Sequence, residues 1–182
     1  MSKWKIASAL ALCSVVIGIG RGFAQQGSAA VALTPQDYME IQQLYSTYAK
    51  AADLADGAGY AGTFTPDGEF VSARDAGQGS WTRSTVKGTE PLIKTGSTSG
   101  LRHHFTNISV KRTPEGADAT CYLLMYTART VPATLSTTAT YQDTLVKTSD
   151  GWRFKRRIMW RDDDPLSPFK PPPLKQPSQT QR

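Results

Sequence analysis

Residues 34–55 read TPQDYMEIQQLYSTYAKAADLA, and their pattern predicts an amphipathic helix at the start of the folded region. Thr34 is a good helix cap, Pro35 suits the first helical position, and Asp37 completes a pattern like a capping box. Apolar side chains then recur at spacings of three and four residues, which places them on one helix face. These residues are Tyr38, Ile41, Tyr45, Tyr48 and Ala52, with Leu44 beside them.

The chain after this helix predicts one more short helix and then mostly strands. The helix is expected over residues 57–64 and is followed by a Thr-Pro-Asp-Gly turn at 65–68. Strands are expected at 69–73, 102–112, 117–130, 136–148 and 152–160, the last of them alternating strictly from Trp152 to Trp160. The Gly-, Ser- and Thr-rich residues 74–100 are expected to be loop, apart from a short helix near 89–94. Helices followed by antiparallel strands indicate an α+β domain with the helices on one face of the sheet.

The two ends of the chain differ in composition from this domain. Lys3 and Lys5 precede an apolar run of about 15 residues, and a Gly-Phe-Ala sequence follows, so residues 1–24 are expected to be a cleaved signal peptide. The apolar run is shorter than the roughly 20 residues that a membrane-spanning helix needs. We expect a flexible leader at 25–33, one domain at 34–164 and a Pro- and Lys-rich, disordered tail at 165–182.

The charge of the domain argues against a nucleic-acid partner. The whole chain carries 21 Lys and Arg against 15 Asp and Glu, but all 15 acidic residues and only 15 of the basic ones lie between residues 33 and 165. A domain without net charge gives no electrostatic reason to bind nucleic acid. The basic cluster at 155–157 is expected to be a solvated face. Cys121 remains as the one cysteine after cleavage and is expected to be a buried thiol.

Two segments about fifty residues apart contain the residues best suited to acid–base chemistry. Asp53 lies near the end of the first helix, and His103 and His104 open a strand. An acid beside a histidine can orient the ring and leave its other nitrogen as a base. Neighbouring strand residues point to opposite faces, so His103 and His104 are not expected to share a metal ion. The alternatives are a solvated carboxylate and an ordinary hydrogen-bonded histidine.

Further residues are candidates for contact with a ligand. Tyr48 precedes Asp53 by five residues and is either a core side chain or an auxiliary acid. Asn107 follows His103 by four residues and is expected on the same strand face. Together with His104, four strand residues are candidates for lining a cavity: Tyr126, Arg129, Tyr141 and Trp160.

The order of these segments resembles the SnoaL-like branch of the nuclear transport factor 2-like superfamily, over roughly residues 34–162. The matching segments are Leu44-Tyr45-Ser46 with Asp53, Tyr60 through Gly68, Arg102-His103 with Thr106-Asn107, and Gly151-Trp152-Arg153-Phe154. The resemblance implies a cone-shaped α+β barrel in which helices pack on a strongly curved antiparallel sheet around an apolar pocket. It also implies homodimers or homotrimers.

Within that superfamily the chain is similar to hexachlorocyclohexane dehydrochlorinase, bile-acid 7α-dehydratase and scytalone dehydratase. This similarity implies that His103 is the base, Asp53 its partner and Tyr48 an auxiliary group. We therefore expect a periplasmic or secreted lyase or isomerase that needs no cofactor and acts on a small apolar or cyclic compound. The alternatives are a non-catalytic domain that binds a small ligand or pairs with another subunit, and an interaction module that uses the C-terminal tail.

Overall fold

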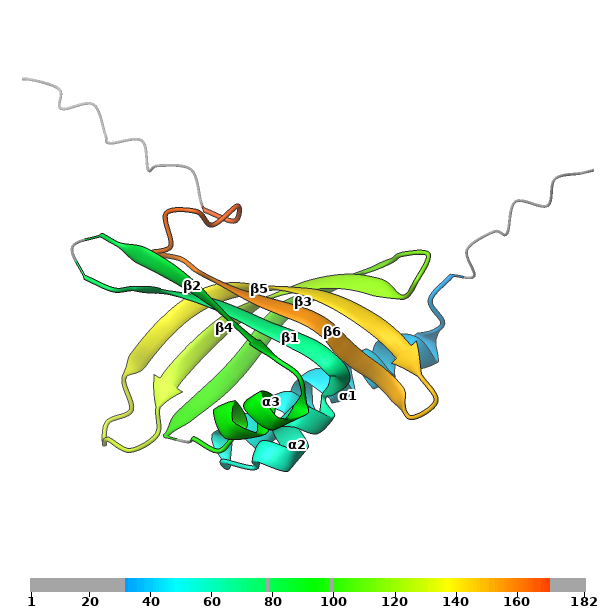
Figure 1. The fold of residues 1–182 in the computed structure, drawn as a ribbon, viewed down its shortest axis with the longest axis horizontal. Coiled ribbons are helices and arrows are strands. Elements are labelled where there is room, and N and C mark those ends of the chain that lie inside the picture. The colour runs from blue at the N-terminus through cyan, green and yellow to red at the C-terminus, as the bar shows by residue number, and fades with distance from the viewer. Residues whose placement is uncertain (1–31, 78, 99, 171–182) are drawn as a thin grey trace, which may run out of the picture.

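Helices lie against one side of a curved six-stranded sheet in the computed structural model, which describes residues 32–77, 79–98 and 100–170 (Figure 1). The helices in this part of the chain are α1 (Pro35–Asp53), α2 (Gly57–Gly62) and α3 (Thr89–Gly96). The strands are β1 (Phe64–Asp75), β2 (Trp81–Lys87), β3 (Leu101–Arg112), β4 (Ala117–Thr127), β5 (Leu135–Thr148) and β6 (Gly151–Arg161). The predicted α+β class is confirmed.

The strand order is β2-β1-β6-β5-β4-β3, so β2 and β3 form the two edges of a sheet that curls around the helices like an open cone. Neighbouring strands are antiparallel except for β1 and β6, which run parallel. The sheet is therefore antiparallel, as expected, apart from this one pair.

Helix α1 begins where the sequence predicts, and its first turn is tied to the sheet. The Thr34 side chain accepts a hydrogen bond from the backbone N–H of Asp37, and the Asp37 carboxylate accepts one from the backbone N–H of Thr34. The same carboxylate also accepts from Lys147 Nζ at 2.6 Å and from Trp152 Nε1 at 3.0 Å. The capping box is thus also the anchor that holds α1 to the β5–β6 hairpin.

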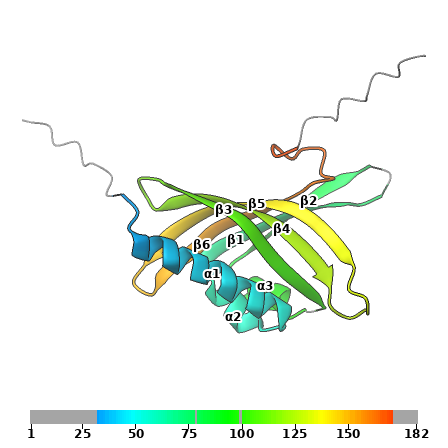
Figure 2. The ribbon, with the colours of Figure 1, turned by 180° about the vertical axis from the view of Figure 1, so that it is seen from behind.

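The apolar stripe of α1 packs on the inner face of the sheet, which is the face that the helices cover (Figure 2). Ile41, Tyr45 and Tyr48 are almost completely buried there, against strand residues such as Leu123 and Phe154. Tyr38 departs from the predicted stripe because it is 44% exposed at the first turn of the helix.

Three segments differ from the sequence-based expectations. Residues 81–87 form edge strand β2 instead of a loop. Their backbone pairs with β1, although most of their side chains are polar and exposed. Residues 65–68 belong to β1, which has an irregular register there, instead of forming a turn. Residues 165–170, expected in the tail, form turns after Asp164, which is fully buried against Arg83.

The predicted signal peptide at 1–24, most of the predicted leader and residues 171–182 of the predicted tail lie outside the described residues. Within the described part of the chain, no helix is both long and apolar enough to cross a membrane.

Candidate active site

Asp53 and His103 meet where the end of α1 lies along edge strand β3 (Figure 2). Asp53 Oδ1 lies 2.6 Å from His103 Nδ1, and the same oxygen accepts the backbone N–H of His103 at 3.1 Å. The two side chains are 12% and 11% exposed. A guanidinium N–H of Arg102 donates to the backbone carbonyl of Asp53 at 3.3 Å, which places positive charge at the negative end of the helix.

The edge position of β3 explains this arrangement. An edge strand presents backbone N–H groups with no neighbouring strand to accept them. The Asp53 carboxylate accepts such a group at His103, so it fixes the strand and the imidazole ring together.

The hydrogen bond also decides what the His103 ring can do. A carboxylate only accepts hydrogen bonds, so Nδ1 of the neutral ring carries the proton and Nε2 carries the lone pair. Nε2 makes no hydrogen bond to any of the described residues, and it is not fully buried. Nε2 is therefore the ring nitrogen whose lone pair is available to accept a proton or a hydrogen bond.

The inner face around His103 is apolar and reaches solvent. Met125 lies directly opposite His103 on β4, so the two side chains share this face. Half-buried apolar side chains continue the surface over β1, β2, β3, β6 and α3. We call this set the inner apolar surface: Phe70, Val86, Ile93, Phe105, Met125 and Met159.

Tyr48 and Tyr141, both predicted as site residues, lie deeper on the same face. The Tyr48 ring meets the His103 ring edge-on with centroids 6.3 Å apart, and its hydroxyl lies 3.2 Å from that of Tyr60 and 3.4 Å from that of Tyr141. Burial raises the pKa values of Tyr60 and Tyr141 well above the ordinary value of a phenol. These two phenols therefore stay neutral and act as hydrogen-bonding groups.

Three other predicted ligand contacts lie on the outer face of the sheet, away from His103. His104 is exposed and its ring meets that of Tyr126 at 5.6 Å. Trp160 also points outward, where its indole N–H donates to Gln142 at 3.0 Å and Arg83 lies over its ring. Strand alternation places His104, Tyr126 and Trp160 on the face opposite to His103, so these predicted ligand contacts do not share its site.

Arg129 and Asn107 are also placed differently from the expectation. Arg129 is exposed in the β4–β5 connection, and its side chain lies against Gly100, just before β3 begins. Asn107 is exposed and has a φ of 55° where the β3–β4 register shifts. This bulge interrupts the alternation, so counting four residues from His103 does not give the face of Asn107.

Sequence analysis missed a buried ion pair on the inner face, formed by Arg157 of β6 and Asp143 of β5. Arg157 was expected on a solvated face. However, the β5–β6 register shifts near Lys155, so Trp152 and Phe154 before the shift and Arg157 after it all point inward. The only sequence signal was a single acid, Asp143, within the predicted strand at 136–148. No group of three or more His, Cys, Asp and Glu residues within the described part could hold a metal ion.

The family model of the SnoaL-like domain matches residues 34–158, which includes every helix and strand described above except the last three residues of β6. The chain belongs to the SnoaL-like family. A comparison with curated proteins found no match.

Solved structures with the same fold include two Novosphingobium aromaticivorans proteins. One is a nuclear transport factor 2-like protein with a cystatin-like fold, 21% identical, with a TM-score of 0.60 over 70% of this chain and 83% of that one. The other is a candidate scytalone dehydratase, 22% identical, with a TM-score of 0.57 over 69% and 84%. A third structure, of a Catenulispora acidiphila protein in complex with S-DNPA, is 26% identical, with a TM-score of 0.57 over 71% and 96%.

Proposed function

We propose that this SnoaL-like protein is a cofactor-independent lyase or isomerase in which His103 is the general base. Neutral His103 takes a proton from carbon through Nε2, and Asp53 stabilises the imidazolium that forms. The proton then returns to another carbon, or it leaves with the departing group. The 2.6 Å contact between Asp53 Oδ1 and His103 Nδ1 carries the proposal, because it orients the ring and leaves Nε2 available.

The surroundings favour a small apolar or cyclic substrate. The inner apolar surface offers aromatic, aliphatic and thioether side chains beside His103, and such surfaces hold ligands by excluding water. The fold is shared with a candidate scytalone dehydratase and with a protein solved in complex with a small molecule, which agrees with this substrate class.

Exchange of carbon-bound hydrogen for deuterium tests the base directly, before the natural substrate is known. Small cyclic ketones and halides with an acidic C–H are incubated with the protein in heavy water and followed by NMR. We expect His103→Gln to slow exchange by about 10²–10⁴-fold, the contribution of a positioned base. His104→Gln is the matched control, since His104 is the next residue and faces outward. Equal exchange rates in the two variants, or no exchange by the wild type, would refute the proposal.

The alternative is a non-catalytic domain that binds a small ligand in the same place. The observation in its favour is the cluster of three buried tyrosine hydroxyls, of Tyr48, Tyr60 and Tyr141, which offers hydrogen bonds but no general base. Under this alternative, His103→Gln and wild type bind ligand equally and neither catalyses exchange.

We also propose that the protein forms a homodimer or homotrimer through the outer face of its sheet. No described helix covers that face (Figures 1 and 2), and Tyr122 is 54% exposed on it. A groove of about 460 Å³ lies there between the sheet and Phe169.

Export to the periplasm or the medium follows from the sequence of residues 1–24 and is part of the same proposal. N-terminal sequencing of the secreted protein should find Gln25 first. Retention of Met1 on a cell-associated protein would refute it.

A further inference from the structure

Arg157 is a fully buried guanidinium held on one side by Asp143. Arg157 Nε and Nη2 donate to the two carboxylate oxygens at 2.8 and 2.7 Å, and the hydroxyl of Tyr45 donates to the same carboxylate. The side chains of Arg157 and Asp143 are both 0% exposed. Burial opposes the charge of Arg157, but Asp143 more than offsets this, and the pKa of Arg157 is raised well above its ordinary value.

The other side of the guanidinium has no acceptor. Arg157 Nη1 is buried and has no hydrogen-bond partner. A buried N–H without an acceptor costs free energy, and more when the group is charged, so native proteins nearly always supply one. Nη1 thus has the chemistry of a binding group for a ligand oxygen.

Five aromatic rings surround the guanidinium, and one of them connects it to the candidate active site. The distances from Arg157 Cζ to the ring centroids run from 3.8 Å to 5.3 Å, for Phe154, Tyr48, Tyr141, Tyr45 and Phe105. Phe105 is the half-buried member of this cage, and its ring centroid lies 6.3 Å from that of His103. Phe105 thus lies between the fully buried guanidinium and the ring of His103.

We propose that Nη1 of Arg157 binds a carboxylate oxygen of the ligand, so that the substrate class is a small apolar ring that carries a carboxylate. The ring lies on the inner apolar surface near His103, and the carboxylate passes Phe105 to reach Nη1. This inference rests on the proposed function for the location of the ligand, but it concerns recognition and not proton transfer.

Benzoate and benzyl alcohol are matched probes, because they share a ring and differ in the charge of the oxygen group. Calorimetric titration of the full chain should give a benzoate affinity at least about tenfold higher than that of benzyl alcohol, as expected for a hydrogen bond between charged groups. The test variant is Arg157→Met with Asp143→Leu, since removing both partners of a buried ion pair preserves folding better than removing one. This variant should lose the preference for benzoate and keep its affinity for benzyl alcohol.

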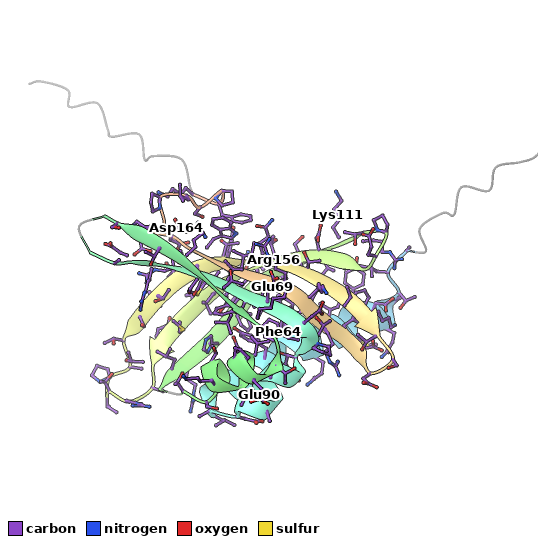
Figure 3. All side chains as sticks on the ribbon, viewed as in Figure 1. Phe64, Glu69, Glu90, Lys111, Arg156 and Asp164 are labelled. Carbon is purple, nitrogen blue, oxygen red and sulfur yellow. The ribbon has the colours of Figure 1, made fainter. Side chains whose placement is uncertain are left out.

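Two controls separate this inference from the proposed function. Arg156→Met removes the next cation along β6, which points outward and pairs with Glu69 at 3.4 Å (Figure 3), and it should keep the preference. His103→Gln should keep the preference too, while losing deuterium exchange. Phe105→Ala should strengthen benzoate binding by opening the route.

Wild type that binds both probes equally, or that does not bind benzoate, would overturn the inference and leave the test of His103 unaffected. An unchanged preference in the double variant would overturn it as well. If the double variant does not fold, Phe105→Ala decides: stronger benzoate binding supports the inference, and unchanged or weaker binding contradicts it.

Discussion

At the scale of single residues, the pairing of Asp53 with His103 predicts that the charge of the carboxylate matters more than its shape. Asp53→Asn keeps the size of the side chain but removes the charge that stabilises an imidazolium. We expect deuterium exchange to fall by roughly 10²–10⁴-fold, with little change in the circular dichroism spectrum. Asp56→Asn is the matched control, because Asp56 caps α2 through the N–H of Gly59 at 2.8 Å and Asn caps equally well. Undiminished exchange by Asp53→Asn would argue that Asp53 serves only to hold β3.

The same residues mark how far the sequence predicts the site. Asp53 and His103 could be proposed as neighbours because helix periodicity, strand alternation and a family resemblance all bear on them. Arg157 could not be placed, because one extra residue near Lys155 moves every later side chain of β6 to the other face. The sequence around a bulge contains no reliable signal of it, and Asn107 in β3 was misplaced for the same reason.

At the scale of elements, the anchoring of α1 through Asp37 predicts a pH-dependent stability. The ammonium group of Lys147, together with donors from Thr34 and Trp152, lowers the pKa of Asp37 below its ordinary value of 3.8. A carboxyl group whose pKa is lower in the folded state stabilises the fold above its ordinary pKa, and this stabilisation is lost as the pH falls below it.

Asp37→Asn should therefore lower the free energy of unfolding by about 1–3 kcal/mol at neutral pH, the cost of losing hydrogen bonds to a charged group. The difference from wild type should shrink as the pH drops below 3.8. Urea unfolding at several pH values measures both effects, with Asp150→Asn in the exposed hairpin turn as the control. A difference that stays constant down to low pH would contradict the assigned role of the Asp37 charge.

The elements themselves were predicted well where local chemistry determines them. The cap at Thr34, the Pro35 start and the strands predicted at 136–148 and 152–160 follow from short-range rules, and the structure confirms them. Strand β2 was missed because its central residues, Thr82 to Thr85, are all polar and gain their structure by pairing with β1, which no local pattern reveals.

At the scale of the whole molecule, all described helices lie on one side of the sheet, so its outer face is the surface that we propose for self-association. Half-buried Leu124 of β4, and Ile158 and Trp160 of β6, lie on the same face as the exposed Tyr122. If copies of the chain meet there, Tyr122→Lys places an unpaired charge in an apolar interface and should shift the protein toward monomer. Light scattering coupled to size-exclusion chromatography measures the mass. Tyr38→Lys is the matched control, because Tyr38 is similarly exposed but lies on α1.

A wild-type monomer, or equal masses for the two variants, would refute assembly through the sheet. Since His103 lies on the inner face, monomeric Tyr122→Lys should retain deuterium exchange, so assembly and proton transfer can be tested separately.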